Sequence, residues 1–190
     1  MNPPSTAVQI ERRVSAALES RPYRKRYHFV PLAQISPHVA HAVIAAEDAR
    51  FYQHHGFDWK EMSRAVEQDL NEGRKRGAST ITQQLVRNLF LSTEPSLLRK
   101  GVEASIVPVA ELMLPKSRIL ELYLNVIEYG PGIYGCDAAS RVYFGVPASV
   151  VSRNQAVALA EVLPAPLHWK PGDKPAYGQQ IKKRMVEAGW

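Results

Sequence analysis

Hydrophobic and polar residues follow a helical pattern along most of this chain. Apolar positions recur three and four residues apart, whereas the strict alternation that is typical of β-strands is almost absent. Glycine and proline stand at most of the boundaries between the periodic stretches. The pattern predicts a mainly α-helical protein, with helices over residues 6–19, 38–53, 58–72, 80–91, 96–113, 116–129, 136–143, 152–162 and 175–188.

Composition narrows the class of protein without choosing a function. The chain has 190 residues, of which 45% are hydrophobic, so we expect one globular domain with a real core. Its formal net charge of +6 is compatible with an anionic partner such as a phosphate-bearing substrate, a nucleic acid or an acidic membrane. The single cysteine excludes an internal disulfide. No apolar run approaches the roughly 18 residues of a membrane span, and no signal peptide is visible.

The stretch AVIAAEDARFYQHHGFDW, residues 42–59, places one carboxylate among apolar neighbours. On the predicted helix, Glu47 shares a face with aliphatic residues on one side and Phe51 on the other. Such a flank would raise the pKa of the carboxyl and suit it to proton transfer. The alternative is an exposed helical glutamate followed by a polar helix end at His54. His54 and Asp58 also permit a metal site, although their spacing is weak evidence for one.

The stretch RGASTITQQLVRNLF, residues 76–90, carries a polar stripe without acids. Thr80 and Gln83 fit a capping box, so a helix begins here. Thr80, Gln83, Gln84 and Arg87 then fall on one face of that helix. Neutral amides and hydroxyls suit a ligand of the same kind, such as a sugar with N-acetyl groups. An ordinary capped helix with a glutamine-rich outer face explains the pattern equally well.

The stretch LLRKGVEASIVPVAEL, residues 97–112, combines cations and an acid on one helical face. Arg99 and Lys100 lie four and three residues before Glu103, so either can pair with it. A surface ion pair is the ordinary interpretation. The functional one is a pair of cations that hold a diphosphate, with the glutamate orienting them or serving as a second carboxylate. Pro108 is expected to kink or break this helix.

The stretch PKSRILELYLNVIEYGPGIYG, residues 115–135, reads as a core helix with one polar line. A broad apolar band accompanies Glu121, Asn125 and Glu128, which are spaced four and three residues apart. This line is expected to be mostly structural. Lys116 and Arg118, near the start of the helix, extend the cationic patch.

Taken together, the order and spacing of these stretches resemble the glycosyltransferase family 51 peptidoglycan polymerases, which include the transglycosylase modules of class A penicillin-binding proteins and their monofunctional relatives. The resemblance covers roughly residues 28 to 170, and the length of the chain fits the monofunctional type. The matching motifs are E-D-x-x-F-x-x-H-x-G from Glu47 to Gly56, G-x-S-T-I-T-Q-Q from Gly77 to Gln84, R-K-x-x-E from Arg99 to Glu103, K-x-x-I-L-E-x-Y-L-N from Lys116 to Asn125, and a looser fifth motif over 152–164. In that fifth motif Gln155 replaces the usual glutamate, although Ser152 and Gln155 still form a capping box.

The resemblance implies a lysozyme-like helical fold, with a head lobe and a smaller membrane-facing jaw lobe around a long cleft. It divides the chain into an N-terminal membrane-proximal segment, 1–27, and a catalytic domain, 28–190. The implied reaction joins lipid-linked disaccharide-peptide units. The donor is a growing glycan on undecaprenyl diphosphate, the acceptor is the 4-hydroxyl of the GlcNAc of lipid II, and the new bond is β-1,4 with inversion.

The resemblance also assigns roles to residues. Glu47 would be the general base, and Arg99, Lys100 and Lys116 would stabilise the leaving diphosphate. Glu103, the second glutamate, would orient these cations, act as an acid, or help a divalent ion at the diphosphate. No cofactor is certain, and Mg²⁺ or Mn²⁺ is the candidate. The remaining expected substrate contacts are Asp48, Phe51, His54, Gly77, Ser79, Thr80, Gln83, Gln84, Arg87, Asn88, Arg118, Glu121 and Asn125.

The resemblance further implies work at the outer face of the cytoplasmic membrane. Family members usually carry an N-terminal transmembrane helix, which is absent from this chain. The basic tract from Arg21 to Arg26 and the apolar stretch LFLSTEPSLL, residues 89–98, are expected to dock on anionic lipid. Cell-wall synthesis or division proteins are candidate partners.

Two other functions compete with this interpretation. A glycan hydrolase of similar fold would share the catalytic glutamate but would not need the cationic R-K-x-x-E cluster. A nucleic-acid-binding module would gather its basic residues on one face. Here acids and amides interleave with the basic residues, so nucleic acid is not expected as a partner.

Overall fold

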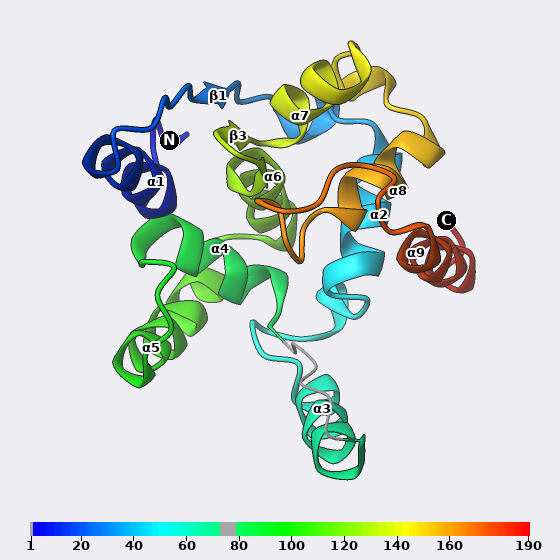
Figure 1. The fold of residues 1–190 in the computed structure, drawn as a ribbon. Coiled ribbons are helices and arrows are strands. Elements are labelled where there is room, and N and C mark those ends of the chain that lie inside the picture. The colour runs from blue at the N-terminus through cyan, green and yellow to red at the C-terminus, as the bar shows by residue number, and fades with distance from the viewer. Residues whose placement is uncertain (1, 73–78) are drawn as a thin grey trace.

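The helices of this chain surround one buried cluster of apolar side chains, in a computed structural model that describes residues 2–72 and 79–190 (Figure 1). Three short 3₁₀ helices, η1 (Leu32–Gln34), η2 (Phe51–Gln53) and η3 (Ala148–Val150), join some of the longer elements. The mainly helical fold that the sequence predicts is confirmed. The α-helices are α1 (Ala7–Leu18), α2 (Pro37–Glu47), α3 (Trp59–Glu72), α4 (Ile81–Phe90), α5 (Leu97–Met113), α6 (Lys116–Val126), α7 (Cys136–Phe144), α8 (Arg153–Glu161) and α9 (Pro175–Glu187).

Hydroxyl side chains begin several of these helices, as the sequence predicts. Thr80 and Ser152 each accept a hydrogen bond from the backbone N–H three residues later, and the glutamine at that position bonds back to the cap. In α8 the returning bond runs from the N–H of Ser152 to Oε1 of Gln155, over 2.9 Å. Gln155 therefore completes the capping box in place of the usual glutamate.

The helices pack as two groups on either side of α6. On one side α2 packs against α8 and α9, and on the other α4 packs against α5, α6 and α1. Figure 1 shows α3 projecting away from both groups. This arrangement brings the end of α2, the start of α4 and the last helix of the chain toward one region, where the cavity described below lies.

A small sheet that the sequence pattern did not predict joins two strands that follow α6 to one that precedes α2. Strands β1 (Arg26–Tyr27), β2 (Glu128–Gly130) and β3 (Ile133–Tyr134) lie in the order β1-β3-β2, with β1 parallel and β2 antiparallel to β3. The helix predicted to reach residue 129 therefore ends at Val126. Glu128 leaves the predicted polar line, and its Oε2 lies 3.2 Å from Nε of Arg12 on α1.

The N-terminal segment is integrated into the rest of the fold. Helix α1 packs against α4, and Glu11 accepts hydrogen bonds from the N–H and hydroxyl of Thr93, at 2.8 and 2.5 Å. Within the described residues, no helix is both long and apolar enough to cross a membrane. The assignment of residues 1–27 as a membrane-proximal segment stays a prediction.

Candidate active site

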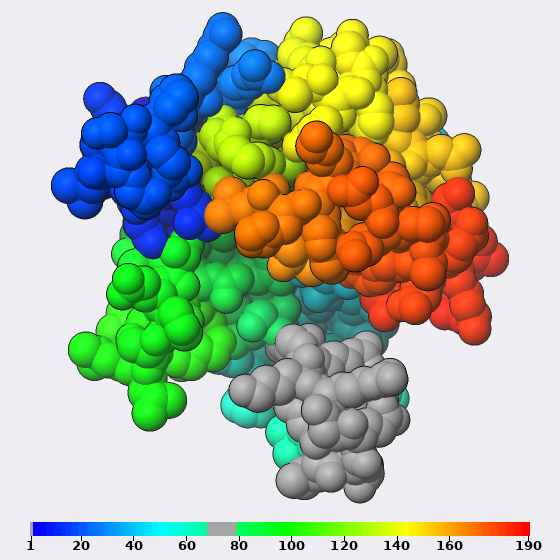
Figure 2. Space-filling model, viewed as in Figure 1, coloured from blue at the N-terminus to red at the C-terminus, as the bar shows by residue number. Residues whose placement is uncertain are grey.

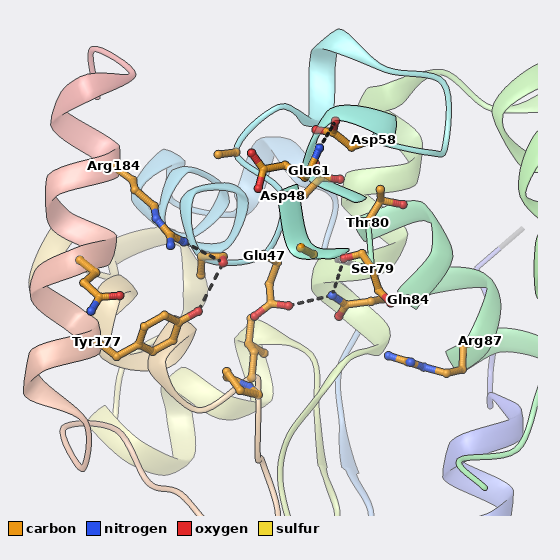
Figure 3. Close-up of a pocket in the computed structure, with 16 residues that line it drawn as sticks. Glu47, Asp48, Asp58, Glu61, Ser79, Thr80, Gln84, Arg87, Tyr177 and Arg184 are labelled. Atoms are coloured by element: carbon orange, nitrogen blue, oxygen red, sulfur yellow. Dashed lines mark hydrogen bonds between the residues drawn. The ribbon is translucent and has the colours of Figure 1, made fainter. Parts of the chain in front are cut away.

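A cavity of about 700 Å³ opens where the end of α2 meets the start of α4. Figure 2 shows this face, where the surface of residues 80–113 and the surface around residues 160–175 flank a recess. Both acidic and basic side chains reach the cavity, together with amides and one tyrosine (Figure 3). Its lining consists of Ala46, Glu47, Asp48, Ala49, Asp58, Glu61, Ala65, Ser79, Thr80, Gln84, Arg87, Leu163, Pro164, Tyr177, Gln180 and Arg184.

Glu47 is the last residue of α2, so the predicted helix over 38–53 is wrong beyond this point. Asp48 leaves the helical conformation, with φ −160°, and its Oδ2 accepts a 3.0 Å hydrogen bond from the N–H of Ile81. This long-range contact ends the helix at the cavity. Phe51 then lies in a 3₁₀ turn, is completely buried in the core and is not part of the cavity lining.

The Glu47 carboxylate sits in an environment that suits a proton acceptor. Its Oε2 accepts a 2.7 Å hydrogen bond from Nε2 of Gln84 (Figure 3). Burial raises the pKa of Glu47, while the Gln84 hydrogen bond and the charge of Arg87 act in the opposite direction. The pKa of Glu47 is therefore shifted in the direction that the sequence predicts, and burial is the largest cause.

Gln84 is held in one orientation by a buried tyrosine. The hydroxyl of Tyr123 on α6 donates a 2.7 Å hydrogen bond to Oε1 of Gln84, which directs the amide nitrogen toward Glu47. The same nitrogen lies 3.4 Å from the carbonyl oxygen of Ser79. A chain of hydrogen bonds thus links the core to the candidate base.

Some polar residues at the start and along one face of α4 cap the helix, and others line the cavity. Gln83 closes the capping box, since its Oε1 accepts from the N–H of Thr80 at 2.9 Å. Asn88 is buried and bonds to the backbone carbonyl of Gln84 at 2.9 Å, so the structure gives it a structural contact instead of a place on the cavity. Ser79, Thr80, Gln84 and Arg87 do line the cavity. Gly77, another expected contact, lies outside the described residues.

Gly56 joins the loop after α2 to α4 and α5. Its φ of +88° lies in the left-handed region that favours glycine, and a Cβ built there would lie 2.4 Å from Cγ1 of Val107. Its carbonyl accepts a 2.6 Å hydrogen bond from the hydroxyl of Thr80. The H-x-G part of the first motif therefore fixes the loop on which His54 lies.

The R-K-x-x-E cluster lies outside the lining of this cavity. Glu103 is 1% exposed, and its two oxygens bond separately to Arg99, at 3.3 Å, and to Lys100. The second glutamate is therefore already occupied by two cations, which disfavours the metal ion considered near it. Helix α5 continues through Pro108, so the predicted break does not occur.

Lys116 is also paired with an acid. Its Nζ lies 2.7 Å from Oε1 of Glu111 and 4.5 Å from the centre of the Phe51 ring. The same oxygen of Glu111 also accepts a 2.5 Å hydrogen bond from the hydroxyl of Thr82. The sequence motifs gave no sign of Glu111. It is recognisable only once α4, α5 and the start of α6 are brought together.

The other expected contacts on α6 hold the chain segment before α2. Asn125 is completely buried, and its amide bonds to the N–H and the carbonyl of Val30, at 2.8 and 2.9 Å. Glu121 accepts from the N–H of Leu32 at 2.7 Å and from Arg118. Asn125 has no exposed surface in this structure, and its contacts there are structural; its expected contact with substrate stays a prediction.

The last helix supplies cavity residues that the sequence did not single out. Tyr177, Gln180 and Arg184 line the cavity from α9, and Nη1 of Arg184 donates to the carbonyls of Ala45 and Ala46, at 3.0 and 3.3 Å. Their spacing of three and four residues is the one signal that could have indicated a common helical face. Arg184 thereby ties α9 to the last turn of α2, which carries Glu47 (Figure 3).

Comparison with known proteins gives one family over nearly the whole chain. The model of the family described as Transglycosylase matches residues 12–188. Three similar relatives bear the name biosynthetic peptidoglycan transglycosylase. The one from Aeromonas hydrophila subsp. hydrophila is 46% identical over 168 residues, covering 86% of this chain and 72% of the relative. Those from Pseudomonas entomophila and Aromatoleum aromaticum are 44% and 45% identical, cover 98% of this chain, and are covered over 81% and 83% of their own lengths.

Proposed function

Because this chain belongs to the transglycosylase family, we propose that it is a peptidoglycan glycosyltransferase that polymerises lipid II into β-1,4 glycan strands during bacterial cell-wall synthesis. The observation that carries the proposal is Glu47, whose carboxylate lies on the cavity wall with a raised pKa and a hydrogen bond from Gln84. A base whose pKa is nearer to the working pH accepts a proton more effectively.

Glu47 takes the proton from the 4-hydroxyl of the acceptor GlcNAc. The hydroxyl oxygen then forms a bond to the anomeric carbon of the donor sugar as the bond to the diphosphate breaks, with inversion, and undecaprenyl diphosphate leaves with the electron pair. Inversion needs the base and the leaving group on opposite faces of the donor sugar, with room between them. The placement of Glu103 outside the lining of the Glu47 cavity is compatible with that requirement.

Stabilisation of the leaving diphosphate falls to cations. Arg99, Lys100 and Lys116 are each paired with an acid, which keeps the three side chains in fixed positions before a phosphate arrives. Glu103 acts in this proposal by orienting Arg99 and Lys100. Arg87 also lines the cavity, so it is a further cation that can contact the substrate.

Polymerisation of fluorescent lipid II tests the proposal. Glu47→Gln should abolish glycan ladders, because an amide cannot accept the proton, while far-UV circular dichroism stays unchanged. Glu67→Gln, the same change at an exposed residue of α3, serves as the matched control and should polymerise like the wild type. If Glu47→Gln produced glycan ladders with the yield of the wild type, the assignment of Glu47 as the base would be refuted.

Two further assays separate this function from its competitors. Release of fragments from undecaprenyl-free peptidoglycan would favour a hydrolase, since that substrate carries no diphosphate. We expect no such release. We also expect inhibition by moenomycin, a phosphoglycolipid that mimics the donor in this family. Failure of moenomycin to bind would count against the donor site at Arg99 and Lys116.

Apolar residues on α5 support docking on a membrane surface. Leu97 and Leu98 are 93% and 81% exposed at the start of this helix, and Phe90, at the end of α4, is exposed as well. Large apolar side chains are costly to leave in water unless another surface covers them. We expect the domain to work at the outer face of the cytoplasmic membrane, with these residues in the lipid headgroup region. Replacing Leu97 and Leu98 by serine should reduce sedimentation with anionic vesicles, whereas Val150→Ser, at another exposed site, should not.

A further inference from the structure

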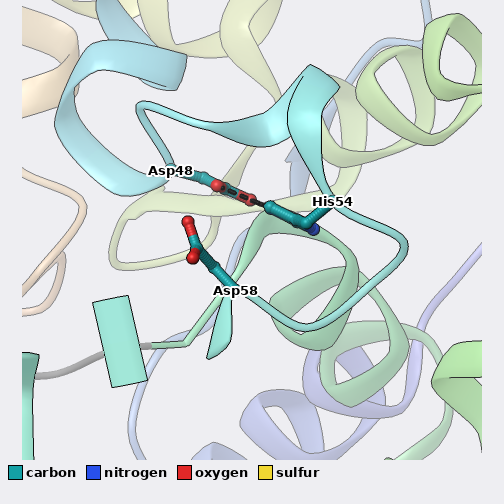
Figure 4. A group of neighbouring side chains, drawn as sticks. All are labelled: Asp48, His54 and Asp58. Atoms are coloured by element: carbon teal, nitrogen blue, oxygen red, sulfur yellow. Dashed lines mark hydrogen bonds and ion pairs between the residues drawn. The ribbon is translucent and has the colours of Figure 1, made fainter. Parts of the chain in front are cut away.

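Three ligand-bearing side chains gather at one end of the cavity. The ligand atoms of Asp48, His54 and Asp58 lie within 4.8 Å of one another, and all three residues are buried (Figure 4). Asp48 follows α2, and Asp58 immediately precedes α3. The cluster is thus built across the loop that Gly56 fixes, and two of its members, Asp48 and Asp58, are on the cavity wall with Glu47.

Asp58 uses only one of its two carboxylate oxygens within the protein. Its Oδ1 lies 3.0 Å from Nη1 of Arg50 and accepts from the N–H groups of Lys60 and Glu61, both at 3.1 Å. Its Oδ2 has no hydrogen-bond donor among the described residues, although Asp58 is only 4% exposed. Figure 4 shows the carboxylate turned toward Asp48. A buried carboxylate oxygen without a partner is costly, so it calls for a ligand.

The hydrogen bonds of His54 hold the Asp48 carboxylate in place. Its Nε2 lies 2.9 and 3.1 Å from the two oxygens of Asp48 and donates to them. Its Nδ1 is buried without a partner among the described residues. Arg50 is the cation that contacts Asp58 among the described residues, through Oδ1 and not Oδ2.

We propose that Asp48 and Asp58 bind an oxygen-preferring divalent cation of the Mg²⁺ or Mn²⁺ class. Oδ2 of Asp58 and a carboxylate oxygen of Asp48 are the ligands from the protein, and water or substrate oxygens complete the shell. His54 orients Asp48 through Nε2–H, as outer residues commonly do for metal-binding carboxylates. This places the cation away from Glu103, where the sequence motif had suggested it and where both oxygens are bonded to cations.

The position of the site connects it to the proposed reaction. A cation at Asp48 and Asp58 borders the same cavity as Glu47, so it would bind oxygens of the substrate in that cavity, apart from the leaving diphosphate assigned to Arg99, Lys100 and Lys116. This use of the cation rests on the proposed function. Binding of the cation does not, and it can be measured without any lipid substrate.

Titration with Mn²⁺ alone, followed by the electron paramagnetic resonance signal of the free ion, tests the site. The wild-type chain should bind one Mn²⁺, and Mg²⁺ should displace it. Asp58→Asn keeps the oxygen that caps α3 but loses the charge at Oδ2, so its dissociation constant should rise by about tenfold or more. Asp48→Asn should give the same result, and it serves in place of Asp58→Asn if that variant does not fold.

Two matched variants make the outcome specific. Glu67→Gln removes an exposed carboxylate from α3, the helix that follows Asp58. Glu103→Gln removes the carboxylate near which the sequence motif had suggested the metal ion. Both should bind Mn²⁺ like the wild type, with thermal unfolding as the check on folding. The proposal is overturned if the wild type binds no Mn²⁺, if Asp58→Asn binds it with wild-type affinity, or if Glu103→Gln alone loses it. Loss of polymerisation in any variant does not bear on this test.

Discussion

Removing the hydroxyl of Tyr123 should weaken the support of Glu47 without altering any side chain that lines the cavity. Tyr123 is completely buried and donates a 2.7 Å hydrogen bond to Oε1 of Gln84, whose nitrogen donates in turn to Glu47. In Tyr123→Phe, Oε1 of Gln84 loses this donor. A flipped amide would direct the oxygen at the Glu47 carboxylate, so a flip offers no remedy.

The size of the effect follows from this geometry. A buried acceptor left without its donor costs about 1–3 kcal/mol, so the free energy of unfolding should fall by that amount in urea denaturation. The Gln84 hydrogen bond lowers the pKa of Glu47, and a less ordered Gln84 holds the ionised carboxylate less well. The acidic limb of the kcat/KM profile for lipid II should therefore move to higher pH. A purely structural role for Tyr123 would reduce stability and leave this limb in place.

Tyr129→Phe is the matched control. Tyr129 is also completely buried, but its hydroxyl has no hydrogen-bond partner within the described part of the chain. Removal of an unpaired hydroxyl should leave the free energy of unfolding within about 0.5 kcal/mol of wild type, or raise it. Equal losses of stability in the two variants, or a pH profile of Tyr123→Phe that coincides with wild type, would refute the support role.

Three further predictions concern charge, backbone and packing. Because the pKa of Glu47 is raised in the folded state, its ionisation lowers the stability of the fold as the pH rises. The melting temperature of Glu47→Gln should therefore be higher than that of wild type at pH 7. This difference should disappear below about pH 4.3, where the carboxyl is protonated in the unfolded chain as well. Gly56→Ala should lower the free energy of unfolding by about 2 kcal/mol or more in urea titrations, because φ is positive there and the new Cβ would meet Val107. Gly145→Ala should lower it less, because φ is also positive there but no atom lies within 4 Å of the new Cβ. Arg184→Met should cost about 1–2 kcal/mol and lower kcat, since it frees the last carbonyls of α2, and Arg184→Lys should restore most of the melting temperature.

Local signals explain why the helices and two of their caps were predictable. The capping boxes at Thr80 and Ser152 need only residues three positions apart, and both are present in the structure. The end of α2 was not predictable in this way. Asp48 leaves the helix while bonding to Ile81, 33 residues later, and no window of the sequence contains that contact. The same reason explains the missed strands, whose two- and three-residue lengths are too short to show a period.

The candidate site was predictable as a set of residues but not as an arrangement. The spacing marked Gln83 as a capping residue, but the contact of Gln84 with Glu47 depends on the packing of α4 against α6 and on the end of α2. The cation Lys116 was also marked. Its partner Glu111 was not, because their pairing depends on the turn between α5 and α6.

The last helix shows how a distant segment can control a motif that does not include it. Arg184 donates to the carbonyls of Ala45 and Ala46, at the end of α2, where a cation is favoured by the helix dipole as well as by hydrogen bonding. The hydroxyl of Tyr177 lies 3.3 Å from the same carbonyl of Ala46. Helix α9 therefore fixes the turn that aims Glu47 into the cavity from one side, while Gln84 and Tyr123 fix its carboxylate from the other. A carboxylate that is held from both sides needs little reorganisation when the acceptor hydroxyl arrives, which is the property that a general base in this position requires.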